Sequence, residues 1–451
     1  MKITLIGQDI PMLFPSLLTD LLFTMKSSAD VAIEERNPAM QDVLQRYGDT
    51  VIRQAGLGNQ LTVDNDRSAL LRDADCVIYA GDLMAATRFR QDREALSGPE
   101  DDPEDPGLTE QARVNGGIGG LLHTLRQGEL IHQLTEEMRS CCPKALVITL
   151  GQPVARTCQM FRKAGFACWG LGKSPLRGPG GLDGICKKLH AKPEQMDAVI
   201  AGLPGFAWLL SLKDKTEQDD LLDVARDAAE ADELGRLAHR WLDWYDAIPV
   251  GDVTAHAEFL PAQEDYQPEA EPTFGESVEQ RKERILYMNT VGEKGLAPAI
   301  PKAQPGEGVM AQMLLLSKAP AIRPMQLAIS LLCGGDLEMP AVTRVNRAGE
   351  IKDLPRDAII EAPLTLRNGV EEVPHLLELP ERLADICLSV DETHRLAAEA
   401  GLGDRSALRE CIEIDPALDG LDRLYIQQLV DAMIRMHSDI LSLWSEDEEE
   451  L

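Results

Sequence analysis

The sequence predicts an α/β protein whose first half forms a parallel, doubly wound sheet and whose second half forms a further, helix-rich α/β domain. Short apolar runs typical of buried strands alternate there with stretches of helical periodicity such as Pro11–Met25 and Leu121–Arg139. We interpret the following runs as strands: Lys2–Gly7, Asp30–Glu34, Cys76–Ala80, Ala145–Leu150 and Ala167–Gly170. A chain of 451 residues is long enough for two domains, which we place at 1–200 and 201–451.

Three stretches of the chain, one in the first half and two in the second, are less regular. Ser97–Gly107, Gln263–Ser277 and Pro298–Gly308 are rich in Pro, Gly and acidic residues and are typical of loops, with a helical stretch at Gln280–Met288 between the last two. A helix-rich segment (Val309–Leu332), a strand near Ala341–Val345 and a hairpin strand at Ala358–Leu366 follow. This hairpin is expected to turn through Asn368-Gly369, and two long helical stretches and an acidic tail at 445–451 close the chain.

Charge and composition restrict the partners. The chain has 75 acidic and 45 basic residues, a net charge of −30, which repels nucleic acid and anionic membranes. No apolar run approaches the roughly 20 residues of a membrane-spanning helix, and no signal peptide precedes the first strand. The nine cysteines have no metal-binding or disulfide spacing, as expected for reduced thiols in a cytoplasmic protein.

The first strand runs directly into a tight turn at Gly7-Gln8-Asp9, the arrangement with which nucleotide-binding domains begin. Such turns normally have a second glycine, which lets the backbone approach a pyrophosphate at the helix N-terminus. Asp9 stands at that position and adds bulk and negative charge. Glu35, at the end of the second strand, could hold an adenosine ribose or simply be a solvated strand end.

Six segments, in order along the chain, resemble motifs of the NAD-dependent family-4 glycoside hydrolases, in the branch of α-glucosidases, α-galactosidases and α-galacturonidases. They are 115–126 (NGGIGGLLHTLR), 142–153 (CPKALVITLGQP), 164–174 (AGFACWGLGKS), 201–208 (AGLPGFAW), 246–261 (DAIPVGDVTAHAEFLP) and 345–361 (VNRAGEIKDLPRDAIIE). The resemblance spans nearly the whole chain in register. It implies common descent with this family.

The resemblance implies a dehydrogenase-like Rossmann domain, an NAD cofactor, a manganese ion and assembly as a dimer or tetramer. The family's reaction is the NAD-dependent exception to two-carboxylate glycoside hydrolysis. Members oxidise the sugar at C3, remove the C2 proton, expel the aglycone, add water and reduce the sugar again. The metal stabilises the negative charge that develops on oxygen.

This chain departs from the family at the positions that bind metal, cofactor and substrate. By the resemblance, the metal-binding cysteine and histidine fall on Gly172 and Gly205, which have no side chain to donate a lone pair, so no manganese is expected. Asp9 weakens NAD binding for the reason given above. The family's substrate-contacting asparagine falls on Gln152.

Several polar residues nevertheless remain as candidates for catalytic or substrate-binding roles. Asp252, His256 and Glu258 lie in the segment where the family places an active-site aspartate, although one extra residue separates Asp252 from His256. These residues could equally be ordinary loop and strand-end residues. Lys173 offers a positive charge that could replace part of the missing metal's charge.

A second candidate site is the start of the helix that follows Asn115, Gly116 and Gly117, where free backbone N–H groups could receive an anionic part of a sugar or nucleotide. Arg113, just ahead, would strengthen such a site. Two functions stay open: an inactive or redirected protein that binds a small sugar or nucleotide, or a metal-independent NAD-dependent glycosidase or sugar oxidoreductase.

Overall fold

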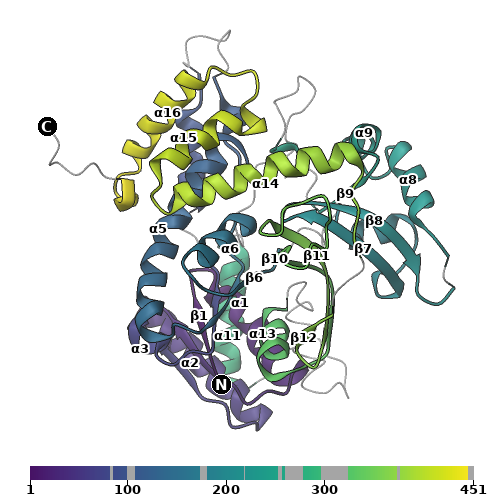
Figure 1. The fold of residues 1–451 in the computed structure, drawn as a ribbon. Coiled ribbons are helices and arrows are strands. Elements are labelled where there is room, and N and C mark those ends of the chain that lie inside the picture. Colours follow the sequence, from purple (N-terminus) through teal and green to yellow (C-terminus); the bar gives the residue numbers. More distant parts are fainter. Residues whose placement is uncertain are drawn as a thin grey trace, which may run out of the picture.

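The computed structural model describes residues 1–81, 85–98, 107–172, 180–217, 219–251, 256–259, 278–295, 323–372 and 376–444. One mixed sheet runs through the molecule in the order β3-β2-β1-β4-β5-β6-β10-β11-β7-β8-β9, and β12 pairs with β11 (Figure 1). Helices cover both of its faces.

The first six strands are parallel and have the strand order of a dinucleotide-binding Rossmann fold. Their bounds are β1 (Lys2–Ile6), β2 (Asp30–Glu34), β3 (Leu61–Asp64), β4 (Cys76–Tyr79), β5 (Leu146–Thr149) and β6 (Cys168–Gly170). Ile3, Leu5 and Ile33 are fully buried. Strands covered on both faces need apolar residues at nearly every position, which explains the continuous apolar runs in this half of the chain.

The strands of the second half extend the same sheet in antiparallel fashion. They are β7 (Met196–Leu203), β8 (Phe206–Asp214), β9 (Ile248–Val250), β10 (Leu337–Val345), β11 (Ile359–Arg367) and β12 (Val370–Glu371). The two halves join through a row of cross-strand neighbours in which Gly170 pairs with Thr343, Thr343 with Glu361, and Glu361 with Gly202. Only two strands, β10 and β11, therefore separate the end of β6 from the end of β7.

The helices of the first half are α1 (Ile10–Thr19), which continues as the π-helical turn η1 (Asp20–Thr24), α2 (Pro38–Ala55), α3 (Arg67–Leu71), α4 (Ala85–Ala95), α5 (Gly117–Cys141) and α6 (Val154–Lys163). α1 and α2 pack on one face of the sheet, and α5 and α6 pack on the other. At the start of α2, Asn37 Oδ1 accepts a hydrogen bond from the Ala39 N–H at 3.0 Å. The helix ends at Gly56 in the left-handed conformation (φ 70°), the usual glycine terminator.

The helices of the second half are α7 (Leu182–Lys188), α8 (Leu222–Glu230), α9 (Arg236–Tyr245), α11 (Val278–Lys294), α13 (Pro324–Cys333), α14 (Glu381–Gly401), α15 (Arg405–Ile414) and α16 (Arg423–Met436). Short 3-10 turns lie at η2 (Thr109–Gln111), η3 (Pro193–Gln195), η5 (Pro416–Leu418) and η6 (Ser442–Trp444). In Figure 1, α14 runs from α15 to α9 across the upper part of the molecule. It approaches α5 closely at two glycines: a Cβ added to Gly128 would lie 1.8 Å from the Gly401 carbonyl oxygen.

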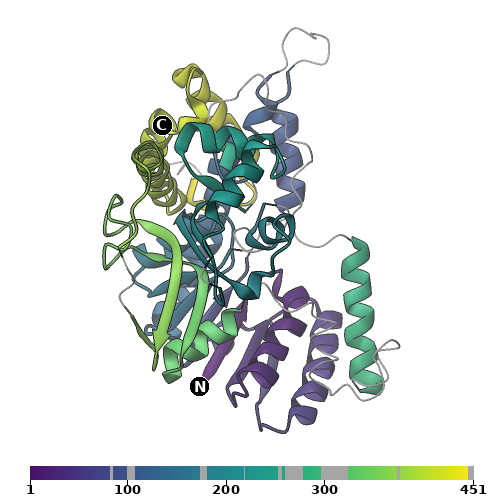
Figure 2. The same ribbon diagram turned by 90° about the vertical axis from the view of Figure 1, so that its right-hand side faces the viewer.

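α11 lies beside α2, at the edge of the Rossmann half (Figure 2). Met288 and Val291 are fully buried in the core that α1 and α2 share, and the rings of Tyr287 and Tyr47 pack with centroids 5.9 Å apart. Arg46 donates a hydrogen bond to Asn289 Oδ1 at 3.3 Å. A segment from the second half of the chain is thus part of the Rossmann half's core.

The predicted fold class is confirmed. The five predicted strands correspond to β1, β2, β4, β5 and β6, and the hairpin turns through Asn368 and Gly369, both with positive φ (52° and 75°). The helical stretch predicted at Gln280–Met288 is α11, which is longer at both ends. β3 and β7–β9 were not predicted, and residues 99–106, 260–277, 296–322 and 445–451 lie outside the described residues. No helix in the described parts of the chain is both long enough and apolar enough to cross a bilayer.

Candidate functional site at the carboxyl ends of the strands

The turn after β1 keeps the close approach that a dinucleotide-binding turn needs. Gly7 has φ +127°, and a Cβ at this position would lie 2.3 Å from the carbonyl carbon of Ala80, after β4. Only glycine fits between these two strand ends. Gly7 therefore allows the two strand ends to lie close together, and its part in cofactor binding stays a prediction.

The N-terminus of α1 offers few donors to a phosphate. The Asp9 N–H is bonded to the Ala80 carbonyl (3.3 Å), the Ile10 N–H to the Gly7 carbonyl (3.1 Å), and the Met12 N–H to the Asp9 carbonyl (3.1 Å). Pro11 has no N–H. The donors that normally bind a pyrophosphate are engaged by backbone carbonyls of the turn and of Ala80, so the first turn of α1 does not fit that group as it stands.

Asp9 has a partner from the far half of the sequence. Its Oδ1 lies 3.8 Å from Nη2 of Arg281, in the first turn of α11, and both side chains are partly exposed. The arginine partly compensates the negative charge that Asp9 brings to this turn. Arg281 was not predicted, because nothing in the local sequence indicates that α11 docks beside the turn.

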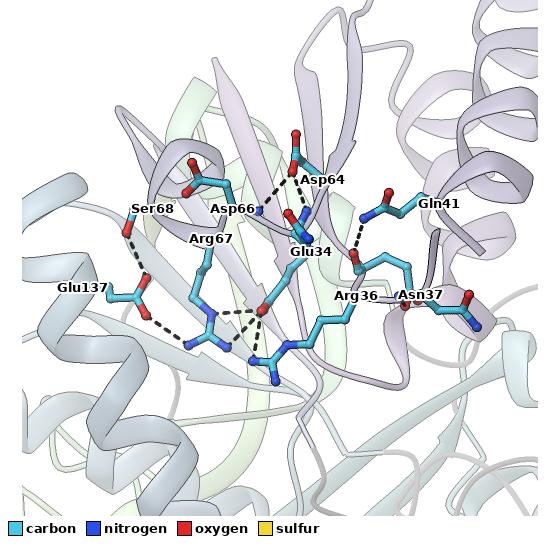
Figure 3. A network of polar contacts seen from close by, with 11 residues as sticks. Glu34, Arg36, Asn37, Gln41, Asp64, Asp66, Arg67, Ser68 and Glu137 are labelled. Carbon is cyan, nitrogen blue, oxygen red and sulfur yellow. Dashed lines mark hydrogen bonds and ion pairs between the residues drawn. The ribbon is translucent and has the colours of Figure 1, made fainter. Parts of the chain in front are cut away.

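A polar network covers the carboxyl ends of β2 and β3 (Figure 3). Arg67 donates to both carboxylate oxygens of Glu34 (3.1 and 3.0 Å) and to Glu137 (3.2 Å), so Glu34 is occupied by a bidentate ion pair. The Glu35 carboxylate accepts from the Asn37 N–H at 2.7 Å, just ahead of α2. Glu35 is partly exposed at the strand end, and its role at a ribose stays a prediction.

The N-terminus of α5 already holds carboxylates of the chain itself. Glu258 Oε2 accepts from the backbone N–H groups of Val114 (3.2 Å), Asn115 (2.5 Å) and Gly116 (3.3 Å) and from the Asn115 side chain (3.0 Å). The Gly117 N–H donates to Asp415 Oδ2 at 3.1 Å. Burial raises the pKa of both carboxyls.

Arg113 is buried and engaged with backbone. It donates to the Glu110 carbonyl at 2.8 Å and to the Glu258 carbonyl at 2.6 Å. A Cβ on Gly116 would lie 2.1 Å from the same Glu258 oxygen, so the chain passes very close to the helix start. The N–H groups at this helix start bind Glu258 and Asp415 of the chain itself, and ligand binding by Arg113, Asn115, Gly116 and Gly117 stays a prediction.

His256 lies in the core. It is 1 % exposed, its Nε2 lies 2.9 Å from the Ala207 carbonyl oxygen, and its ring packs against Phe206 and Trp208 at 5.2 and 5.0 Å. These contacts are those of a structural histidine. Asp252 and Lys173, the other two predicted catalytic residues, lie outside the described residues.

Gln152 lies at the end of β5, in the turn that leads into α6, and its side chain is exposed there. Its peptide bond to Pro153 is cis. Its carbonyl oxygen lies 3.0 Å from Nε2 of His123 on α5. Burial and the nearby Arg126 lower the pKa of His123 to about 3, so this imidazole is neutral. His123 was not predicted, and the sequence around it indicates only a buried helix.

Gly205 lies in the turn between β7 and β8 with φ +78°, a conformation that side-chain-bearing residues rarely adopt. Its N–H donates to the carboxyl of Glu361, which is 1 % exposed. Burial raises the pKa of Glu361 to about 8, so it is largely protonated at neutral pH. Glu361 was also missed, although an acidic residue in an apolar strand is a recognisable signal.

The described residues do not fit a manganese ion. Gly172 and Gly205 provide no side-chain ligand, and the described parts of the chain contain no group of three or more His, Cys, Asp or Glu residues placed to hold a metal. For NAD the fit is mixed, because Gly7 and Glu35 suit a dinucleotide whereas the first turn of α1 does not. The predicted absence of manganese stays a prediction, since Lys173 and Asp252 are not described.

The parallel strand order 3-2-1-4-5-6, with a glycine turn after β1, defines the class of this protein as one with a dinucleotide-binding Rossmann fold. The models of the family-4 glycosyl hydrolases match residues 2–167, and those of the C-terminal domain of the same family match residues 200–418. The chain belongs to the family-4 glycosyl hydrolases.

Individual relatives are distant in sequence. An α-glucosidase from Erwinia rhapontici is 23% identical over 90% of this chain and 91% of its own length. The crystal structure of lplD from Bacillus subtilis has a TM-score of 0.71 at 20% identity, covering 96% of this chain and 99% of its own. A 6-phospho-α-glucosidase from gut microorganisms, crystallised with NAD and Mn²⁺, has a TM-score of 0.70 at 13% identity, covering 97% and 98%. These structures share the fold of this chain.

Proposed function

We propose that this protein is a family-4 glycoside hydrolase homologue that binds a small sugar or nucleotide but has lost, or redirected, the metal-dependent reaction. The observation that carries the proposal is the pair of glycines at 172 and 205. By resemblance these positions hold the metal ligands, and at Gly205 the backbone has a left-handed φ of +78°. A histidine there would be strained, so the turn itself is adapted to glycine.

The cofactor region supports the same proposal. The N–H groups of Asp9, Ile10 and Met12 are bonded to backbone carbonyls, and the Asp9 carboxylate stands at the helix N-terminus, where a pyrophosphate would bring like charge. The second anion site, at the start of α5, is filled by Glu258 and Asp415. Of the two proposed ligands, the sugar fits these surroundings better, because it carries fewer negative charges than a nucleotide, a dinucleotide or a sugar phosphate.

The alternative is a metal-independent NAD-dependent glycosidase or sugar oxidoreductase. One observation favours it: the close approach of Gly7 to Ala80 is retained, and Arg281 lies beside Asp9, where it could offset the carboxylate. NAD in the 6-phospho-α-glucosidase of gut microorganisms is consistent with this alternative. In this case NAD would supply the hydride chemistry, Gly7 and Glu35 would orient it, and Glu361 or Glu258 would be the acids near the strand ends.

The deciding experiment measures turnover and binding separately. Nitrophenyl glycosides, 6-phosphoglycosides and sugar acids are assayed with NAD and with NAD plus Mn²⁺, and the same sugars are tested for thermal stabilisation. The proposal expects stabilisation by at least one sugar without turnover under either condition. Turnover with NAD in the absence of Mn²⁺ would establish the alternative. Turnover that requires NAD together with Mn²⁺ would contradict the loss of the metal site.

Two further properties are proposed on composition and family resemblance. The nine cysteines carry free thiols, most of them buried, which suits a cytoplasmic location. Assembly as a dimer or tetramer is proposed because family members assemble in this way. Sedimentation velocity of the purified protein would test it.

A further inference from the structure

A small hollow lies between α15 and α16, two helices that pack against each other near the end of the described chain (Figure 1). Its volume is about 50 Å³, which is enough for about four waters at the ~10–15 Å³ that each one needs. Its floor is apolar, because Leu408, Ile412 and Trp444 belong to the buried core of this region. The hollow shares none of the described residues of the candidate site at the carboxyl ends of the strands.

Charged side chains of both signs stand on the wall of this hollow. Arg405 and Arg409 lie one turn apart on α15, and Asp431 lies on α16. All three residues are exposed, so a ligand can reach them from solvent. Within the described parts of the chain, their side chains form no ion pair and no hydrogen bond, either with one another or with other residues. The hollow therefore lies between opposite charges that have no counterion among the described residues.

One of the two arginines is oriented by an aromatic ring. The guanidinium carbon of Arg405 lies 5.3 Å from the centroid of the Trp444 ring, and Trp444 itself is buried. A guanidinium stacked in this way keeps its N–H donors available at its edge and loses less freedom when it binds a carboxylate. Gln427, the remaining polar residue of the wall, is already engaged, because it donates to Glu413 Oε1 at 3.3 Å.

The arrangement of these charges selects the ligand. Two guanidinium groups suit a carboxylate, whereas the carboxylate of Asp431 attracts an ammonium group and repels a simple anion. A molecule that carries both charges satisfies both sides of the hollow, and the apolar floor accepts a short aliphatic group. We propose that this hollow binds a zwitterionic α-amino acid with a small aliphatic side chain, its carboxylate toward Arg405 and Arg409 and its ammonium group toward Asp431.

The test uses L-alanine as the probe, because it combines a carboxylate, an ammonium group and a methyl group in a molecule small enough for the hollow. Calorimetry measures its affinity, and hydrogen exchange locates it through slower amide exchange in peptides covering 405–412 and 427–431. Propionate lacks the ammonium group and ethylamine lacks the carboxylate. Each should bind at least about tenfold more weakly than L-alanine, because it makes only one of the two charge contacts.

Two substitutions separate the two sides of the hollow. Arg409→Gln should weaken the binding of L-alanine by about tenfold, because it removes one guanidinium partner of the carboxylate. Asp431→Asn should weaken L-alanine by a similar factor and leave propionate as weak as before or make it bind more tightly, a difference that a general loss of structure would not produce. Arg382→Gln, at an exposed position of α14 outside the hollow, is the matched control and should bind L-alanine as the unmodified protein does.

Three outcomes would overturn the proposal: no binding of L-alanine and no protection of these peptides, equal affinities for propionate and L-alanine, or an equal loss of both ligands in Asp431→Asn. Near-ultraviolet circular dichroism of each variant confirms that the fold is retained. The two substitutions lie on different helices, so a folding defect in one leaves the other to decide. The experiment involves no sugar, NAD or metal, so a negative result here leaves the proposed function untouched.

Discussion

Glu258 and Asn115, 143 residues apart in the sequence, are joined by a hydrogen bond of 2.5 Å from the Asn115 N–H to Glu258 Oε2. The same oxygen accepts from Val114 and Gly116, so one carboxylate satisfies most of the free donors ahead of α5. A helix N-terminus attracts negative charge whether it comes from a ligand or from the protein. Here the protein supplies it.

Glu258→Ala should therefore lower the free energy of unfolding by about 2–3 kcal/mol, because several buried donors lose their acceptor. Urea unfolding measures the loss. Added acetate should restore part of the stability of this variant, since its carboxylate can occupy the vacated position. Glu279→Ala, at an exposed position of α11, should have little effect and no acetate dependence. A Glu258→Ala protein as stable as the unmodified one would show that the cap is unimportant.

Gly172→Cys combined with Gly205→His should create manganese binding that the unmodified protein lacks, because the two substitutions restore side-chain ligands at the positions aligned with the family's metal site. Manganese electron paramagnetic resonance titration measures free and bound metal.

Gly205→Ala is the control for backbone strain. Both Gly205→His and Gly205→Ala should lower the free energy of unfolding by about 1–2 kcal/mol, because φ is +78° at this position. Stoichiometric manganese in the unmodified protein would refute the loss of the site.

Asp9→Gly should tighten NADH binding, by roughly tenfold, because it removes the carboxylate from the α1 N-terminus and leaves Arg281 available to a phosphate. Arg281→Ala should weaken binding, because Asp9 then has lost its nearby cation (3.8 Å). Fluorescence titration with NADH measures both variants. Glu283→Gln, at an exposed position two residues along α11 from Arg281, should leave the affinity unchanged. Equal affinities in all four proteins would exclude a role of the pair in dinucleotide binding.

The pH dependence of stability should carry a contribution from Glu361. Burial raises its pKa from the ordinary 4.5 to about 8, so the folded state binds this proton more tightly than the unfolded state. The contribution to stability is fully present below pH 4.5 and is lost progressively as the pH rises from 4.5 to about 8.

Glu361→Gln is neutral at every pH and should remove this decline, so that the variant becomes more stable than the unmodified protein at alkaline pH by a few kcal/mol at most. Denaturant unfolding across the pH range measures the difference. Glu283→Gln should follow the unmodified protein throughout. A constant difference between Glu361→Gln and the unmodified protein would mean that Glu361 does not titrate between these limits.

Local sequence was sufficient for five of the six strands of the Rossmann half because these five are largely buried on both faces, whereas the half-exposed edge strand β3 was missed. β2 lies at the predicted residues, and the other predicted strands differ by one or two residues at their ends. β7 and β8 were missed because their runs, Met196–Leu203 and Phe206–Asp214, are separated by only two residues and have no strong alternation. Their strand conformation depends on antiparallel pairing with each other and with β9.

For the candidate site, the sequence by itself determined the residue types: a carboxylate at position 9, glycines at 172 and 205, and a glycine-rich helix start after Asn115. Only the tertiary structure decided what faces them. It brought Arg281 to Asp9, Glu258 and Asp415 to the start of α5, and Glu361 to Gly205. The physical reason is that strand and helix patterns are short-range, whereas the charge that compensates a buried or crowded group comes from whichever distant segment packs against it.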